Sequence, residues 1–179
     1  RSEEAVKTAV HKENMMSNQQ PTYAIQPIGT VHRPAEGFYL QLDEPFRSGL
    51  KQLEHFSHVI VLWWATGQDT PEARGQLTCY PPYAPDKHTG VFATRAEYRP
   101  NPIGMTVCQI TGLDEAKGIV QVRNIDAFEN TPIVDLKGYF PVCDRVNGAT
   151  IPAWLDWGID HLPDEGMGLY EEYEEAEAA

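Results

Sequence analysis

The sequence predicts a mainly β protein: a small, mostly antiparallel β-barrel with one or two short helices and a short C-terminal extension. Three observations support this fold class. Fourteen prolines and fourteen glycines in 179 residues favour many turns and short elements over long helices. Several short apolar segments are separated by polar turns, which is typical of antiparallel sheets. No apolar run approaches the roughly 18 residues that a membrane-spanning helix needs.

The chain divides into one domain and two flanking segments. Residues 1–20 are polar and are expected to form a mobile N-terminal extension, residues 21–150 to form the barrel, and residues 151–179 to form a docking segment with an acidic tail. The first segment lacks the apolar centre of a signal peptide. Three cysteines lie far apart without Cys-x-x-Cys spacing, which favours neither a disulfide framework nor a zinc cluster. We therefore expect a cytoplasmic protein without a membrane segment.

The first part of the barrel domain contains two strand candidates and one helix candidate. Residues 23–33 form an extended segment that a proline and a glycine interrupt. Residues 37–43 alternate apolar and polar side chains with the period of two that marks a half-buried strand. Residues 45–56 carry three apolar side chains at helical spacing, which predicts a short helix.

The second part begins with the most apolar stretch of the chain. Residues 57–65 are nearly all apolar and rich in β-branched side chains, which predicts a central strand buried on both faces. Residues 66–89 form a long polar stretch, and a loop of that length in a compact domain is usually functional or mobile. Residues 105–113 and 119–126 are strand candidates joined by a turn.

Two segments complete the pattern. Residues 133–136 form a short extended piece, and residues 151–161 carry spaced tryptophan, leucine and isoleucine side chains that predict a short docking helix. The tail, residues 164–179, contains seven acidic residues and no lysine or arginine. It is expected to form a charged helix or to be disordered.

Residues 90–104, Gly-Val-Phe-Ala-Thr-Arg-Ala-Glu-Tyr-Arg-Pro-Asn-Pro-Ile-Gly, form the most informative segment. Arg95 and Arg99 lie four residues apart, and Asn101 lies between two prolines. Proline fixes its own φ, removes a donor and pushes the preceding residue to an extended conformation. The backbone is therefore stiff where the polar side chains are densest, and a stiff loop loses little entropy on binding. This predicts a binding site. The alternative is a structural turn with two surface arginines.

A second polar cluster follows the strand candidate at residues 119–126. It contains Asp126, Thr131, Asp135 and Tyr139, together with a lysine two residues after Asp135. In an extended segment that lysine and Asp135 share one face. Each aspartate is a candidate anchor for a ribose hydroxyl or an amine. The alternative is that Asp126 opens a turn and that Asp135 pairs with an arginine.

Motifs of several other protein classes are absent from the sequence. There is no glycine-rich dinucleotide or phosphate loop, no Gly-x-Ser-x-Gly elbow and no cysteine in a catalytic context. His55 and His58 bracket a helix-to-strand junction and lack an evident third ligand, so we predict no metal site.

The charge distribution restricts the kinds of partner. The net charge is −12, and residues 21–163 hold 11 basic and 16 acidic residues, a net charge of −5. Proteins that bind nucleic acids normally show a basic footprint. Any such footprint in this chain has to be local, built from the arginines near residues 90–104.

The pattern Gly-Val-Phe-Ala-Thr-Arg-x-x-x-Arg-Pro-Asn-Pro-Ile-Gly resembles the signature of the TsaA-like family, also called the TrmO or YaeB-like family. Other matching pieces follow in the order of that family: Pro-Ile-Gly-Thr-Val at 27–31, Leu-x-x-Leu-Glu-x-Phe-Ser-His at 50–58, Thr-Pro at 131–132 and Tyr-Phe-Pro at 139–141. The resemblance covers about residues 23 to 157.

This resemblance implies a small β-barrel that binds S-adenosylmethionine and works as a homodimer, with the cofactor near the subunit interface. It implies methylation of the exocyclic nitrogen of threonylcarbamoyl-adenosine in tRNA, with Asp135 or Tyr139 as the catalytic proton acceptor. Two alternatives stay open: a methyltransferase of a small-molecule acceptor, and a non-catalytic module that binds S-adenosylmethionine. The implied cofactor-binding residues are Phe92, Arg95, Arg99, Asn101, Pro102, Ile103, Gly104, Asp126 and Thr131.

The chain departs from the family pattern at two turns. Residues 129–132 read Glu-Asn-Thr-Pro where the family usually has Asp-Gly-Thr-Pro, and residues 137–139 read Lys-Gly-Tyr where Lys-Pro-Tyr is common. Asparagine is enriched among non-glycine residues with positive φ. We therefore expect the first of these turns to be retained.

Overall fold

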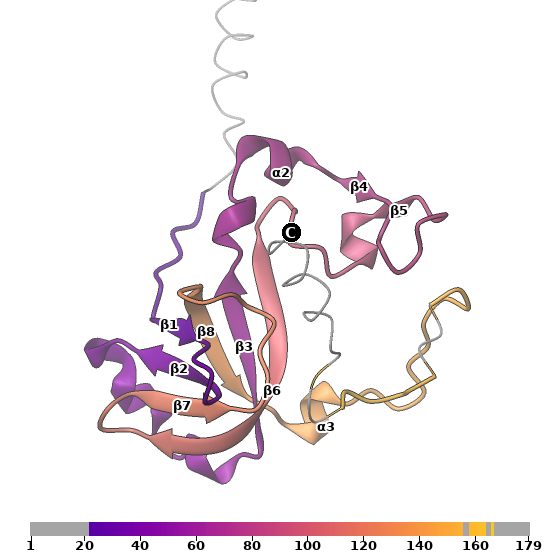
Figure 1. Ribbon diagram of the computed structural model, residues 1–179. Coiled ribbons are helices and arrows are strands. Elements are labelled where there is room, and N and C mark those ends of the chain that lie inside the picture. Colours follow the sequence, from indigo (N-terminus) through magenta and orange to yellow (C-terminus); the bar gives the residue numbers. More distant parts are fainter. Residues whose placement is uncertain (1–21, 156–157, 164–165, 167–179) are drawn as a thin grey trace, which may run out of the picture.

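The computed structural model describes residues 22–155, 158–163 and 166, so the predictions for residues 1–20 and for most of the tail lie outside the described residues. Six strands close into an antiparallel barrel in the order β1-β2-β7-β6-β3-β8 (Figure 1). The few helices are short. The predicted fold class, a mainly β antiparallel barrel, is confirmed.

The elements are short throughout. Within the described residues no helix has the length and apolarity that crossing a membrane requires. The barrel strands are β1 (Gly29–His32), β2 (Phe38–Leu42), β3 (His58–Trp64), β6 (Ile103–Asp114), β7 (Ile119–Val122) and β8 (Pro132–Gly138). A separate two-stranded sheet contains β4 (Thr78–Cys79) and β5 (Thr89–Gly90). The helices are the 3₁₀ segments η1 (Glu44–Leu50), η2 (Leu53–His55), η3 (Thr66–Gln68) and η4 (Val91–Ala93), and the α-helices α2 (Pro71–Gly75) and α3 (Pro141–Asp144).

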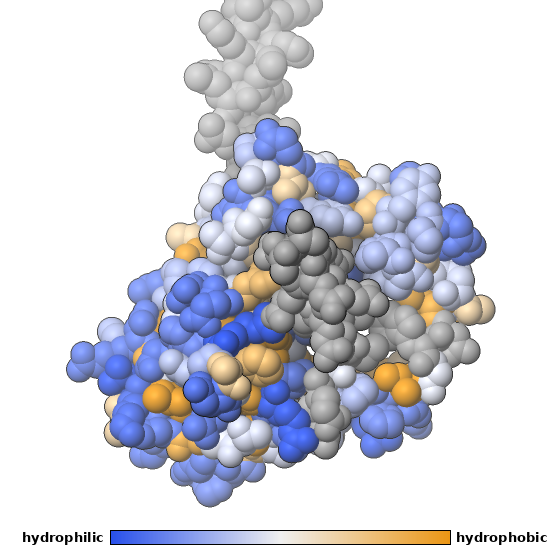
Figure 2. All heavy atoms as spheres, viewed as in Figure 1, coloured by the Kyte–Doolittle hydropathy of each residue, from blue (hydrophilic) through white to orange (hydrophobic). Residues whose placement is uncertain are grey.

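Alternate residues of the strands fill the barrel interior. In β2, Leu40 and Leu42 are buried and the residues between them are less so, which confirms the predicted alternation. In β3, Val59, Val61 and Trp63 are buried while the intervening side chains are only half-buried. The prediction of a strand buried on both faces is therefore wrong, because a closed barrel has only one interior. On the face seen in Figure 2, hydrophilic residues cover much of the surface and hydrophobic residues are scattered among them.

The predicted helix over residues 45–56 is two 3₁₀ segments rather than one α-helix. Gln52 lies between them with φ at 71°, in the left-handed region, and this interrupts the helical hydrogen bonding. The apolar face was nevertheless predicted correctly. Leu50 is buried, and Phe46 and Leu53 pack against the core.

Other strand and helix boundaries differ from the predicted ones where the chain has no neighbouring strand to pair with. The predicted strand over residues 23–33 narrows to β1, because residues 22–27 are exposed and join no sheet. The strand predicted over 119–126 ends at Val122. The long stretch 66–89 carries η3, α2 and β4 beside one end of the barrel (Figure 1). The described part of 151–161 forms a turn and bends instead of the predicted helix.

A close contact between β3 and β6 explains the glycine that ends the motif. Trp63 pairs with Gly104 across the two strands. A Cβ atom on Gly104 would lie 2.2 Å from the Trp63 ring, so only glycine leaves room for the indole. The Trp63 Nε1 atom donates a buried hydrogen bond of 3.1 Å to Thr106 Oγ1. The motif is thereby fixed to the core at its C-terminal end.

Replacing Gly104 with alanine should destabilise the protein by about 2–3 kcal/mol, because an added methyl group in a filled core forces its neighbours to move. Urea unfolding followed by tryptophan fluorescence measures the change. Gly67→Ala is the matched control, since nothing lies within 4 Å of its Cβ position. Equal unfolding free energies for the two variants would contradict this account of the contact.

Candidate functional site

The motif loop, residues 90–104, leads from β5 through η4 into β6, and backbone bonds hold both of its ends. The Val91 N–H donates to the Leu77 carbonyl at 3.0 Å. The Ala65 N–H donates to the carbonyl of Pro102, a buried residue, at 2.8 Å. The loop is therefore tied to β4 on one side and to the end of β3 on the other.

Arg99 holds the interior of the motif loop. Its Nε donates to the Ala96 carbonyl at 2.7 Å, and its Nη2 donates to the carbonyls of Val91 and Thr94 at 3.1 and 3.0 Å. All three described bonds stay within the loop, and bonds from a charged donor are stronger than neutral ones. Arg99 therefore fixes the shape of the loop, and a direct contact with a ligand stays a prediction.

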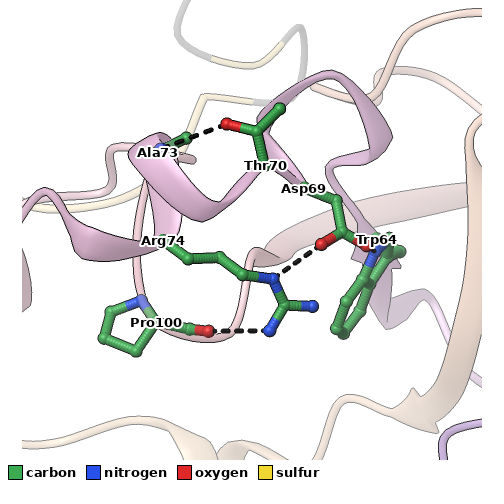
Figure 3. Close-up of polar contacts among 6 residues, drawn as sticks. All are labelled: Trp64, Asp69, Thr70, Ala73, Arg74 and Pro100. Atoms are coloured by element: carbon green, nitrogen blue, oxygen red, sulfur yellow. Dashed lines mark hydrogen bonds and ion pairs between the residues drawn. The ribbon is translucent and has the colours of Figure 1, made fainter.

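A second arginine braces the loop from outside. Arg74, on α2, donates from Nη1 to the Pro100 carbonyl at 3.1 Å and from Nε to Asp69 Oδ1 at 2.6 Å (Figure 3). Trp64 Nε1 donates to the other oxygen of Asp69 at 2.9 Å, and the Arg74 guanidinium lies 5.4 Å from the Trp64 ring centre. Hydrogen bonds from Arg74 and then Trp64 hold the pKa of Asp69 below its ordinary value. The carboxylate is thus a fixed anchor for the brace.

Three predicted ligand-binding side chains project from this rigid frame. The Phe92 ring is 80% exposed, and Arg95 and Asn101 are exposed as well. The loop therefore presents an aromatic face, a guanidinium and a carboxamide to a ligand. Ile103 and Gly104 instead begin β6.

The connection from β7 to β8 brings two members of the second polar cluster, Asp126 and Thr131, to the same end of the barrel. The charge of Asp126 lies close enough to add to the effect of burial in raising the pKa of both Glu97 and Cys108. Thr131 is buried, and its carbonyl accepts from the Val31 N–H at 2.9 Å. The structure therefore places Asp126 beside the motif loop. The structure also adds Glu97 to the candidate site residues. Sequence reasoning did not select Glu97, and the one indication was that its carboxylate lies between the two motif arginines.

The altered turn before Thr131 is retained, as expected. Asn130 has φ at 61° and its N–H donates to the Val31 carbonyl at 2.9 Å. Glu129 accepts from the Arg33 N–H and lies 2.9 Å from His32 Nδ1. These bonds hold the pKa of Glu129 below its ordinary value, with the Arg33 N–H contributing most.

Asp135 lies on β8, opposite Leu62 of β3. Its Oδ2 atom is 2.6 Å from Lys137 Nζ, so the two side chains share a face, and its partner is a lysine rather than an arginine. Asp135 lines a hollow of about 440 Å³ together with Phe46, Leu50 and Phe56, which come from η1, η2 and their flanks. The hollow is mainly apolar and belongs to the side of the barrel covered by these 3₁₀ segments.

Tyr139 lies farther along the barrel. Its N–H donates to the His58 carbonyl at 3.0 Å, at the opposite end of β3 from Trp64, beside which the motif loop enters β6. Six residues of strand separate these two ends, a span of about 20 Å. Within one chain the structure therefore does not bring Tyr139 to the motif loop.

The described residues contain no group of three histidine, cysteine, aspartate or glutamate side chains suited to a metal ion. Cys79 and Cys108 are buried and Cys143 is exposed, all three as free thiols.

The fold and site define a class of protein in which a stiffened loop on a closed antiparallel barrel presents exposed aromatic and polar side chains. The family model for the tRNA-methyltransferase O N-terminal domain matches residues 15–145. The chain therefore belongs to the family that this domain defines, and the resemblance to the TsaA-like or TrmO family is confirmed.

Relatives and solved structures agree with this membership. An S-adenosyl-L-methionine-binding protein of Archaeoglobus fulgidus is 34% identical over 140 residues, covering 69% of this chain and 94% of the relative. Another protein of that organism, named "Probable S-adenosyl-L-methionine-binding protein", is 37% identical over 117 residues, covering 65% of this chain. A crystal structure of TrmO from Pseudomonas aeruginosa has a TM-score of 0.60 and 28% identity, covering 76% of this chain.

The matched region is only part of some of these proteins. It spans 30% of the second Archaeoglobus protein and 63% of the Pseudomonas TrmO structure.

Glu97→Gln should raise the thermal midpoint at about pH 8 and leave it unchanged at about pH 4. Burial first, and then the charge of Asp126, raise the pKa of Glu97 in the folded protein. A raised carboxyl pKa contributes stability below the unfolded pKa of about 4.3, and that stability is lost as pH rises through the folded pKa. The amide removes the cost of ionisation. Scanning calorimetry at the two pH values measures the difference.

The control for this experiment is Glu115→Gln, at an exposed position in the turn between β6 and β7. It should leave the midpoint nearly unchanged at both pH values. An identical shift for Glu97→Gln at the low and the high pH would show that ionisation of Glu97 does not oppose folding.

Proposed function

We propose that this protein binds S-adenosylmethionine on the motif loop and transfers the methyl group to the exocyclic nitrogen of threonylcarbamoyl-adenosine in tRNA. The observation that carries the proposal is the braced loop, which exposes Phe92, Arg95 and Asn101 in a chain of the tRNA-methyltransferase O family. The names of the relatives, which are S-adenosyl-L-methionine-binding proteins, support the choice of cofactor.

The exposed side chains fit the chemistry of this cofactor. An exposed ring such as Phe92 suits the adenine face, and the Asn101 amide suits hydrogen bonds to the adenine edge or the methionine part. The Arg95 guanidinium suits a bidentate contact with the methionine carboxylate. Glu97 and Asp126 supply negative charge beside the loop, which favours the ammonium and sulfonium of the ligand.

The chain contributes mainly by alignment. When bound, S-adenosylmethionine supplies an electrophilic methyl group on a sulfonium. In-line attack needs the acceptor nitrogen about 3–3.5 Å from that carbon, and rigid positioning lowers the barrier. Arg99 and Arg74 hold the loop in shape before the ligand arrives. A carboxylate with a raised pKa, such as Glu97, suits the acceptance of the proton that the nitrogen loses.

A homodimer would explain how the two predicted catalytic residues, Asp135 and Tyr139, reach the site. Tyr139 lies away from the motif loop of its own chain, and Asp135 lines the hollow on the side of the barrel. In our proposal the barrels pair so that Asp135 or Tyr139 of one subunit faces the loop of the other, with the cofactor near the interface.

A small-molecule acceptor is the second candidate. It is favoured by the net charge of −12, since an acidic protein repels the phosphates of tRNA except at a local basic patch. Both candidates use the same cofactor and the same loop, so they differ only in what the acceptor side of the site contacts.

Arg95→Ala should weaken the binding of S-adenosylmethionine by about tenfold or more, because a charge-assisted contact with the carboxylate is lost. Calorimetric titration with S-adenosylmethionine and S-adenosylhomocysteine measures the affinities. Lys117→Ala removes the same charge in the turn between β6 and β7 and should leave them unchanged. An Arg95→Ala affinity equal to that of the wild type would remove Arg95 from the site, and no binding by the wild type would contradict the cofactor assignment.

Purified protein should transfer a labelled methyl group to tRNA that carries threonylcarbamoyl-adenosine and not to the same tRNA lacking the threonylcarbamoyl group. Binding of that tRNA should weaken steeply as salt rises, because phosphate contacts release counterions. Micromolar cofactor binding without transfer to either tRNA would favour the small-molecule acceptor.

A further inference from the structure

Residues 77–90, which we call the aromatic arm, project beside the barrel and end at the first residue of the motif loop (Figure 1). In the arm β4 pairs with β5. Two turns follow each other at its tip, where the Ala84 N–H donates to the Pro81 carbonyl at 2.9 Å and the Lys87 N–H donates to the Ala84 carbonyl at 3.0 Å. An arm that is already ordered loses little entropy when it binds a partner.

The arm exposes aromatic rings that contribute little to the core. Tyr80 is 62% exposed and stacks on His88, with ring centres 5.0 Å apart and planes 28° apart. Tyr83 is 40% exposed, and His88 is exposed as well. The Tyr80–His88 stack is therefore an exposed aromatic pair, and exposed apolar surface of this kind on a folded protein marks an interaction site more often than an isolated exposed ring does.

The charge of this region differs from that of the whole chain. Residues 76–95 hold two basic residues, Lys87 and Arg95, and one acidic residue, Asp86, a net charge of +1, whereas the whole chain has −12. Lys87 pairs with Asp86 at 2.5 Å, and Arg95 lies exposed at the base of the arm. The arm itself holds Lys87 and Asp86, a net charge of zero, so it repels a polyanion less than the rest of this acidic protein does.

We propose that the aromatic arm stacks against unpaired RNA bases that flank the base held at the motif loop. This inference rests on the proposed function and adds the surface that contacts the substrate. Single-stranded RNA is commonly recognised by stacking of splayed bases on Tyr, Phe and His rings, with nearby cations on the phosphates. The Val91 N–H bond to Leu77 joins the arm directly to the motif loop, so a flanking nucleotide on Tyr80 belongs to the same strand as the acceptor.

The test uses a synthetic RNA hairpin with a single-stranded loop, a blunt RNA duplex of the same composition, and the full chain. Tyr80→Leu removes the aromatic face, Tyr80→Phe keeps it, and Tyr23→Leu is the control at a position 82% exposed outside the arm. Tyr80→Leu should weaken hairpin binding roughly 5- to 150-fold, the range for losing one stacked base. Tyr80→Phe and Tyr23→Leu should leave it unchanged, and duplex binding should be weak for all variants.

Four outcomes would overturn the inference. The first two are an absence of hairpin binding by the wild type and an unchanged hairpin affinity in Tyr80→Leu. The third is weaker S-adenosylmethionine binding by Tyr80→Leu, which would assign the ring to the cofactor. The fourth is an altered oligomeric state of that variant by light scattering, which would assign the ring to a contact with a second copy of the chain. The proposed function fails separately, when calorimetry finds no cofactor binding by the wild type. Circular dichroism of Tyr80→Leu verifies that the variant is folded.

Discussion

The carbonyl groups of the motif loop impose the constraint on which the candidate site depends. Two prolines remove N–H donors from the loop, and its irregular path provides no strand ladder, so its carbonyls need donors from side chains. Arg99 supplies them from inside the loop and Arg74 supplies one from α2. Each arginine is therefore part of the backbone architecture, and the side chains that face outward are held at fixed positions.

Contacts with the barrel fix the position of this rigid loop relative to the rest of the molecule. Trp63 fills the space above Gly104 and fixes the start of β6, while the connection from β7 to β8 carries Asp126 to the same end of the barrel. A site built in this way uses loops at the end of a closed antiparallel sheet. It needs neither a glycine-rich phosphate loop nor a parallel sheet, which agrees with the absence of such a motif from the sequence.

The sequence predicted the fold class, the alternation in β2 and the position of the motif loop, because these depend on local periodicity and proline stereochemistry. It did not separate Arg95 from Arg99, since which arginine turns inward depends on where η4 places the carbonyls of Val91 and Thr94. It grouped Tyr139 with Asp126 because they are close in sequence, whereas β8 carries Tyr139 along the barrel. The apolar run of β3 was misread because the outer side of a barrel strand can also be apolar and only half-buried.

The most direct test of the central claim is a crystal structure of the full chain with S-adenosylhomocysteine. The account predicts ligand density against Phe92, Arg95 and Asn101, with the motif loop in the shape described above and its Arg99 bonds to the carbonyls intact. Density elsewhere, such as in the hollow lined by Phe46 and Asp135, would contradict the assignment of the site. A loop that refolds around the ligand would contradict the claim that Arg99 and Arg74 form the site in advance.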